Sequence, residues 1–200
     1  KGIVAETGYG PSLGGKPPIL LSMVPDARQL ICLDLGNEQF TGALVNLRGR
    51  FEKQISLPVN GRTAQAALDL VYELLDQLLN HVTVPVLGMA LGSPGLIDAD
   101  AGLVKQSVNL GWHDLPLQQL LADRYEFPVY IANDSHLAAL AEYSYGDDDT
   151  SNLVLIKMGQ GIGSGIVLNG RIFYGEGFGA GEIGHVSVVD NGEQCSCGNV

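Results

Sequence analysis

The chain has 200 residues, 46% hydrophobic and 16% charged, so it can form a core and is not an intrinsically disordered protein. Its three cysteines are too few for a disulfide-stapled secreted scaffold. No apolar run reaches the roughly 20 residues of a membrane span, and the start lacks the apolar core of a signal peptide, so we expect a soluble, cytoplasmic protein.

Charge and glycine content set two further expectations. The formal net charge is −11, which disfavours binding to a nucleic-acid backbone, so this chain is not expected to be the main DNA- or RNA-binding surface. Glycine is abundant, with 27 residues, and ten of them lie between residues 159 and 184. Such density indicates tight turns or a backbone that approaches another group closely.

The first half of the chain begins with a leader and continues as regular α/β structure. Residues 1–29 predict a short hairpin followed by an extended linker, and the alternative is a disordered tail over the first ten residues. Three strands and a helix follow, over 30–36, 41–49, 51–58 and 62–80. The helix is expected to bury a stripe formed by Ala64, Ala67, Leu68, Val71, Leu74, Leu75 and Leu78. The apolar run 86–92 predicts a strand buried on both faces.

Helices and strands alternate in the second half. The patterns predict a helix over 115–127, a strand over 128–134 and a helix over 135–146, for which Asn133 or Asp134 is a suitable N-cap. The acidic stretch from Gly146 to Thr150 is expected to be a surface loop. Three more strands follow, over 152–159, 163–168 and 171–175, and the last two meet at an Asn169-Gly170 hairpin turn.

This order of elements predicts an α/β fold with a mixed sheet covered by helices. It is the order of the ribonuclease H-like, actin-like ATPase fold found in actin and hexokinase. We expect a leader over 1–29, an actin-like domain over 30–132, and the start of a second such domain over 133–200. The second domain is incomplete at Val200, so the sequence is expected to be a fragment of a two-domain protein of the sugar-kinase type.

One motif near the end of the chain has the composition of a metal site. His185 lies in GEIGHVSV (181–188), and Cys195 and Cys197 lie in CSCG (195–198). An imidazole and two thiolates suit tetrahedral zinc, which needs four ligands. Only three are visible, and the alternative is that the two thiols pack in a core.

A glycine-rich turn over 159–165, GQGIGSG, joins two predicted strands. Its backbone N–H groups are suited to cradle a phosphate, although a tight hairpin also explains the glycines. The turn lacks the Walker signature.

Polar residues follow the predicted strands at the edge where open α/β sheets bind ligands. Asn133 and Asp134 stand at a strand-to-helix junction, and Asp134 is suited either to cap the helix or to bind a sugar hydroxyl and act as a general base. The turn from Gly92 to Gly95 is expected to face the same cleft. Asn109, Gly111 and Trp112 lie in a polar loop, where the tryptophan either packs or lines a site.

Together these segments resemble the ROK family of repressors and sugar kinases. The resemblance covers nearly all of residues 30–200, in the right order. Its motifs are GSPGLID (92–98), SVNLGW (107–112), ANDSHLAALAE (132–142), the glycine-rich run 155–188 and CSCG (195–198). The leader resembles the wing and linker that join a winged-helix DNA-binding domain to the body of the family's repressors, those for N-acetylglucosamine and xylose among them.

The resemblance implies a role for each matching residue. A sugar cleft would be lined by Ser93, Asn109, Asn133, Asp134, Glu182 and His185. Structural zinc would be held by His185, Cys195, Cys197 and a fourth ligand beyond Val200. The remnants of the phosphate loops would be Asp34, Gly36, Gly159, Gly161 and Gly163.

The phosphate loops separate repressors from kinases. The first strand of the family's kinases ends in D-x-G-G-T, whereas this chain reads Asp34-Leu35-Gly36-Asn37-Glu38, and the second loop reads Gly159-Gln160-Gly161 without a threonine. An anionic glutamate repels a triphosphate. We therefore predict a non-catalytic, sugar-sensing part of a transcriptional repressor that does not use Mg-ATP.

Partners follow from the same resemblance. They are a sugar or sugar-phosphate effector, operator DNA bound through an absent winged-helix domain, and further copies in a dimer or tetramer. The first alternative is a sugar kinase with Asp134 as its base. The second is a non-catalytic interaction protein with a vestigial cleft.

Overall fold

The computed structural model describes residues 2–12, 14–146, 150–159, 161–189, 192–195 and 197–198. The middle of the predicted acidic loop, Gln160 in the glycine turn and Ser196 in the cysteine motif lie outside the described residues. None of the described helices is long and apolar enough to cross a membrane.

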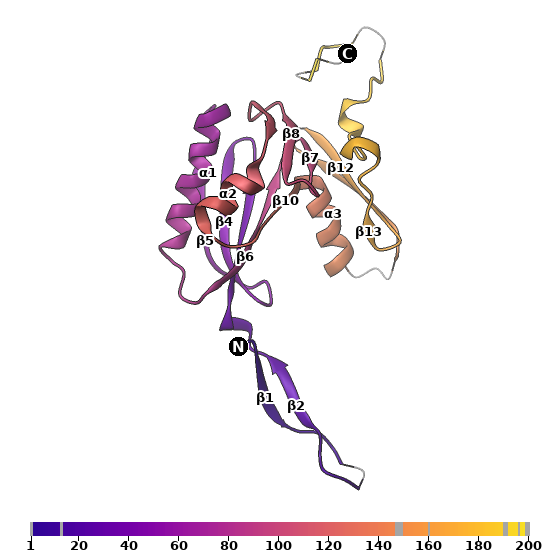
Figure 1. Ribbon diagram of the computed structural model, residues 1–200. Coiled ribbons are helices and arrows are strands. Elements are labelled where there is room, and N and C mark those ends of the chain that lie inside the picture. The colour runs from indigo at the N-terminus through magenta and orange to yellow at the C-terminus, as the bar shows by residue number, and fades with distance from the viewer. Residues whose placement is uncertain are drawn as a thin grey trace.

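A two-stranded hairpin projects from the body (Figure 1). It pairs β1 (Val4–Tyr9) with β2 (Ile19–Met23) in antiparallel register. A 3-10 turn, η1 (Pro25–Ala27), connects it to the body, where Leu47 N–H donates to the Pro25 carbonyl oxygen at 3.0 Å. The predicted hairpin is therefore confirmed, and β1 occupies most of the ten residues for which a disordered tail was the alternative.

The body is built on a five-stranded mixed sheet in the order β10-β6-β3-β4-β5. Its strands are β3 (Gln29–Leu35), β4 (Gln39–Asn46), β5 (Phe51–Pro58), β6 (Val86–Ser93) and β10 (Val129–Asn133). Strands β3, β6 and β10 are parallel, and β3, β4 and β5 form an antiparallel meander. Every strand predicted between residues 30 and 134 is present within a few residues of its expected ends.

One face of this sheet is covered by α1 (Ala64–Leu79) and α2 (Leu117–Tyr125). The stripe on α1 is buried as predicted except at its first position, since Ala64 begins the helix and is exposed, whereas Leu70 is buried. Deep in this layer, a Cβ on Gly42 would lie 2.5 Å from a methyl carbon of Leu78, so helix and strand approach closely.

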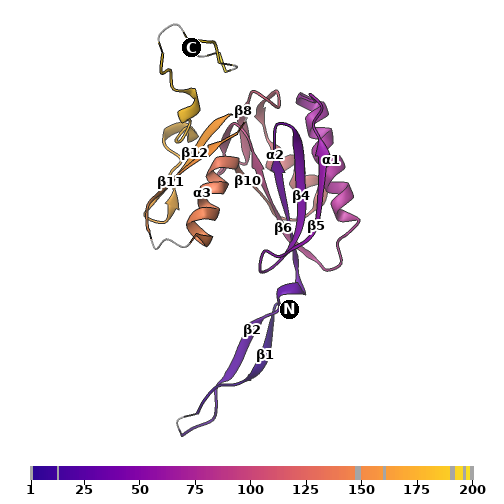
Figure 2. The same cartoon turned by 180° about the vertical axis from the view of Figure 1, so that it is seen from behind.

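The opposite face is only partly covered, which corrects one prediction. The α3 helix (Asp134–Tyr145) packs beside Gly92 at one end of this face, and Figure 2 shows it on the side away from α1. In the described residues, Ala90 on β6 remains exposed and Tyr130 on β10 is 68% exposed. The strand predicted to be buried on both faces is therefore covered fully on only one.

A second correction concerns residues 96–115, where we expected a polar loop around Asn109 to Trp112 and the start of a helix at Leu115, and no strand. They form a small antiparallel sheet of β7 (Leu96–Asp98), β8 (Leu103–Ser107) and β9 (Trp112–Leu115). Trp112 is buried, and its indole N–H donates to the Ala64 carbonyl oxygen at 2.9 Å. Its role is therefore packing, because the indole has a partner at the start of α1.

The fourth described sheet pairs β11 (Leu153–Met158), β12 (Ile162–Leu168) and β13 (Arg171–Ile172), and α3 packs against its first two strands. Asn169 and Gly170 both have positive φ, 50° and 75°, as the predicted hairpin turn requires. The strand predicted over 171–175 is shorter than expected and ends at Ile172, and the chain turns at Gly175, which has φ 69°, into η2 (Glu176–Phe178). A last 3-10 turn, η3 (Ile183–His185), follows. The predicted domain boundary falls where β10 meets α3, and the division into domains stays a prediction.

Candidate functional site

The carboxyl ends of three parallel strands meet at one edge of the large sheet. The register places Asp34 on β3 beside Gly92 on β6, and Asn133 on β10 beside Ser93 on β6. The topology therefore gathers the polar residues that the sequence predicted to face one cleft.

Asn133 holds two elements together at this edge. Its side-chain oxygen caps α3 by accepting hydrogen bonds from Ser135 N–H at 2.8 Å and His136 N–H at 3.1 Å. Its amide nitrogen donates to the Gly95 carbonyl oxygen at 2.8 Å. Of its two amide N–H groups, one is thus used by the protein, so only the other can serve a ligand.

Ser93 departs from its predicted role. It lies at the expected edge but is fully buried, and its hydroxyl donates to the Pro94 carbonyl oxygen at 3.2 Å. The turn after it is tight because Gly95 has φ 104°, where any Cβ would overlap the Gln106 backbone. In this structure Ser93 therefore supports the turn and is not exposed to a ligand.

Asp134, the candidate acid–base residue, is the first residue of α3. One carboxylate oxygen accepts the Ser135 N–H at 2.8 Å, and the other lies 2.6 Å from the ammonium nitrogen of Lys157 on β11. Asp34 stands in the same electrostatic environment. Partial burial raises the pKa of its carboxyl group, the Lys157 charge lowers it, and the Asp134 charge raises it.

The β3–β4 turn is tied to the predicted sugar-binding loop. Asn109 lies after β8, and its amide nitrogen donates to the side-chain oxygen of Asn37 at 3.0 Å. Asn37 occupies the position of the second glycine in the kinase loop pattern. This hydrogen bond therefore connects a phosphate-loop remnant to a residue expected to bind sugar.

The glycine-rich run serves close packing at two of its positions. A Cβ on Gly163 would overlap the Ser135 hydroxyl, and one on Gly165 would overlap the Ser135 carbonyl oxygen and the side chain of Ala139. These glycines allow β12 to lie directly against the first turn of α3. Gly159 and Gly161 have open space around them, and the Gly159 N–H donates to the Gly161 carbonyl oxygen at 2.9 Å.

The segment that carries Glu182 is anchored on α3 and β12. His136 is buried, and its Nε2 donates to the Ala180 carbonyl oxygen at 3.1 Å. The Gly181 carbonyl oxygen accepts both the backbone N–H and the hydroxyl of Ser164, at 3.1 and 2.9 Å. The position of Glu182 is thus fixed through its neighbours.

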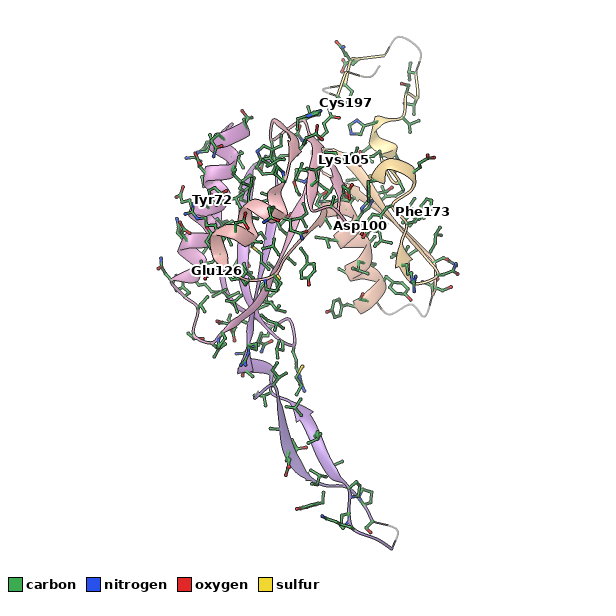
Figure 3. All side chains as sticks on the ribbon, in the orientation of Figure 1. Tyr72, Asp100, Lys105, Glu126, Phe173 and Cys197 are labelled. Carbon is green, nitrogen blue, oxygen red and sulfur yellow. The ribbon has the colours of Figure 1, made fainter. Side chains whose placement is uncertain are left out.

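His185, Cys195 and Cys197 come together as the sequence predicts. Their ligand atoms lie within 4.8 Å of one another, and the Nδ1 of His185 is 3.2 Å from the Cys197 sulfur and 3.7 Å from the Cys195 sulfur. Tetrahedral zinc needs about 3.6 Å between a nitrogen and a sulfur ligand, so the donor set fits. The Nε2 of His185 lies 3.5 Å from a Glu182 carboxylate oxygen. Figure 3 shows Cys197 on the C-terminal segment, far from Tyr72 on α1.

Two residues of this site were missed at the level of sequence. Lys157 is a single charged residue in an otherwise apolar strand, LVLIKM, and that position was the available signal. His136 lies three residues after the cap and is buried. The helical spacing alone did not indicate that it would lie on the buried face of α3.

The comparisons with known proteins agree with the fold. The model of the ROK family matches residues 30–200. The chain belongs to the ROK family. Its ROK relatives include the xylose repressor of Caldicellulosiruptor bescii, 32% identical over all of this chain and 51% of the repressor. The glucokinase of Halalkalibacterium halodurans is 35% identical over 86% of this chain and 54% of the kinase.

Among solved structures, a ROK transcriptional regulator described as a homologue of the Escherichia coli MLC protein superposes with a TM-score of 0.82 and 28% identity. The match covers 99% of this chain and 51% of the regulator. The predicted α/β, actin-like fold is confirmed. This chain spans about half the length of the curated ROK relatives it matches.

Proposed function

We propose that the chain is the effector-binding part of a ROK-family transcriptional repressor that senses a sugar and regulates carbohydrate-metabolism genes. In this proposal the sugar closes the cleft and shifts the attached DNA-binding domains of an oligomer, which acts on operator DNA in the cytoplasm. The match to repressors over the whole chain, leader included, supports it.

The composition of the β3–β4 turn is the observation that supports a non-catalytic role for this chain. Asn37 and Glu38 replace the residues that handle phosphates in the kinase pattern, and Asn37 is engaged with Asn109. A carboxylate 4 Å from a phosphate charge costs about 1 kcal/mol even in water, and more in a cleft. This turn therefore disfavours the binding of a triphosphate, while the residues expected to bind the sugar on the opposite side of the cleft are retained.

The sugar would meet a set of hydrogen-bond acceptors. Asp134 presents a carboxylate fixed by Ser135 and Lys157, and Glu182 presents another, held beside His185. Carboxylates accept hydrogen bonds from hydroxyl groups, which a sugar offers on neighbouring carbons. Asn109 would contribute from its loop.

Zinc would be held by His185, Cys195 and Cys197 together with a further ligand. Zinc supplies no reaction in this proposal and has a structural role, because it would join η3 to the cysteine motif that follows it. His185 would then orient Glu182 through its second ring nitrogen, as histidine ligands commonly do with carboxylates.

A sugar kinase is the second candidate, favoured by the 35% identity to a glucokinase. In that case Asp134 would be the base that takes a proton from the sugar hydroxyl. The two candidates differ in whether Mg-ATP binds.

The test is a thermal-shift screen of the full chain against xylose, glucose, N-acetylglucosamine and their phosphates, with and without Mg-ATP and zinc. A ligand at 100 times its Kd stabilises by about 2.7 kcal/mol. The proposal expects a shift with one sugar and none with Mg-ATP. A shift with Mg-ATP, followed by phosphate transfer, would replace it with the kinase.

Two variants locate the response in the cleft. Asp134→Asn should abolish the sugar-induced shift, because an amide replaces a charged acceptor. Asp100→Asn removes the charge of an exposed residue between β7 and β8 and should keep the shift (Figure 3). No shift with any sugar would leave the vestigial-cleft alternative.

A further inference from the structure

Lys157 points from β11 toward the start of α3. Along this strand, Leu153, Leu155 and Lys157 alternate with Val154 and Ile156, and the latter two are more than half exposed. Since alternate residues of a strand face opposite sides, Lys157 lies on the same side as the leucines, which is the side packed against α3. Its side chain is 48% exposed, and its ammonium group has a charged partner at the start of α3.

That partner is the carboxylate expected to bind the sugar. The Lys157 ammonium nitrogen lies 2.6 Å from Asp134 Oδ2, and the Asp134 side chain is 22% exposed. The other Asp134 oxygen accepts the Ser135 N–H, so both oxygens of the carboxylate are held. The charge of Lys157 also reaches Asp34, the last polar residue of β3. The register places Asp34 beside Gly92, and a Cβ on Gly92 would lie 3.7 Å from the Asp134 Cα, so the two acidic residues stand at neighbouring positions of this edge.

Two carboxylates on neighbouring elements are what a protein uses to hold Mg²⁺ or Mn²⁺. We propose that Lys157 is a positioning and specificity-determining residue that takes the place of a divalent cation between Asp134 and Asp34. It fixes Asp134 as an ionised hydrogen-bond acceptor and excludes a metal ion from this end of the cleft. The part that concerns sugar rests on the proposed function, whereas the part that concerns metal does not.

The contrary view is that Lys157 forms an ordinary surface ion pair. Its side chain is 48% exposed, and exposed ion pairs contribute little to stability. The two views differ in what removal of the ammonium does. If the ion pair is an ordinary one, removal of the ammonium group should change neither metal binding nor sugar binding. In the proposal, its removal leaves two carboxylates that lack their cation, so both should change.

The first experiment measures Mn²⁺ binding to the full chain by the loss of the free-ion EPR signal. Lys157→Gln should bind one Mn²⁺ about tenfold more tightly than the wild type. Lys157→Arg keeps the charge and should behave as the wild type does. Lys53→Gln on β5 is the matched control for loss of a lysine elsewhere. Adding Asp34→Asn to Lys157→Gln should abolish the gain, and no gain in Lys157→Gln would overturn the metal part.

The second experiment titrates the effector sugar by calorimetry into the same variants. Lys157→Gln should weaken sugar binding about tenfold, and Lys157→Arg should restore it. Equal affinity in all variants would overturn the positioning role while leaving the proposed function intact. If no variant, nor the wild type, binds any sugar, the proposed function fails, and the Mn²⁺ measurement still decides the metal part.

Discussion

At the scale of single residues, Asn133 has a mainly structural effect on the site. Its oxygen caps α3 and its nitrogen fixes the turn at Gly95, so one amide sets the distance between the end of β6 and the start of α3. A residue that is expected to touch the ligand thus also holds the frame in which Asp134 sits.

Asn133→Ala should lower the free energy of unfolding by about 2 kcal/mol, because the cap and the bond to Gly95 are both lost. Asn133→Ser keeps a capping oxygen and should lose about half as much. Urea unfolding of the two variants measures the difference. Equal losses would mean that the cap contributes nothing.

The cysteines should differ in reactivity. Burial raises the pKa of the Cys32 thiol, so it should react slowly with iodoacetamide at neutral pH. Cys195 and Cys197 should react readily in the presence of a chelator and be protected by added zinc. Mass spectrometry of the labelled peptides identifies each site. Protection of Cys32 alone by zinc would contradict the ligand set.

Residue types in a motif were enough to predict the candidate metal ligands and the polar edge of the sheet. His185, Cys195 and Cys197 are near each other in sequence and carry their chemistry in their side chains. The engagement of Lys157 and the burial of Ser93 depend on which strand packs against which, and a single sequence does not contain that information.

At the scale of elements, α2 is fixed to α1 by a polar network. Arg124 lies 2.9 Å from an Asp76 oxygen and stacks over the Tyr72 ring, with its guanidinium carbon 4.3 Å from the ring centre. The Tyr125 hydroxyl donates to Asp76 at 2.8 Å. Burial raises the pKa of Tyr125, and so do the hydrogen bond to Asp76 and the charge of Asp76.

This network should make stability depend on alkaline pH. The folded pKa of Tyr125 lies above the unfolded value of about 10, so its contribution is complete below that pH and is lost as the pH rises past it. The free energy of unfolding in urea should therefore stay level up to about pH 9 and fall as the pH is raised from about 10 to about 12. Tyr125→Phe should lose about 1 kcal/mol at the lower pH and show a weaker fall. An unchanged fall would assign the effect to other groups.

Two glycines of the run 159–165, one before β12 and one within it, should respond differently to alanine. Gly165→Ala places a methyl group against the Ser135 carbonyl oxygen and should cost about 1–3 kcal/mol, because α3 must shift away from β12. Gly161→Ala meets nothing within 4 Å and should be nearly neutral. Thermal unfolding compares the two. Equal effects would show that close packing is not the reason for Gly165.

Long periodic segments were predictable, and short ones were not. The α1 stripe and the apolar strands each contain many residues that fit one periodic pattern. The structure confirms their predicted positions. β7 and β9 have three and four residues, too few for an alternating pattern to be visible. β13 has only two residues and ends at Ile172, before the end that the apolar pattern indicated.

At the scale of the whole molecule, apolar side chains remain exposed on the sheet farthest from α1. Val154, Ile156 and Met158 face away from α3 and are 61%, 56% and 80% exposed, on a strand that is also the edge of its sheet. Exposed apolar edge strands favour association with other chains. Solubility of the chain by itself is thus limited by this face.

Ile156→Lys should reduce binding of the dye ANS to this chain and change the free energy of unfolding by less than about 0.5 kcal/mol. Leu155→Lys, one residue away on the side facing α3, should destabilise clearly, because it places a charge against packed apolar groups. If both variants unfold alike, the assignment of the two faces of β11 is wrong.

The projecting hairpin has a mechanical consequence. Its six-residue strand β1 is about 20 Å long. In the part of the chain that the structure describes, the base of the hairpin is joined to the end of β4 by the hydrogen bonds of Leu47 to Pro25 and of Asn46 to Asp26. A lever of that length converts a rotation of about 5° at the base into about 2 Å of travel at its tip. Small adjustments near β4 are therefore amplified along the hairpin, and a spin label placed near Ser12 would report them more sensitively than one on the sheet itself.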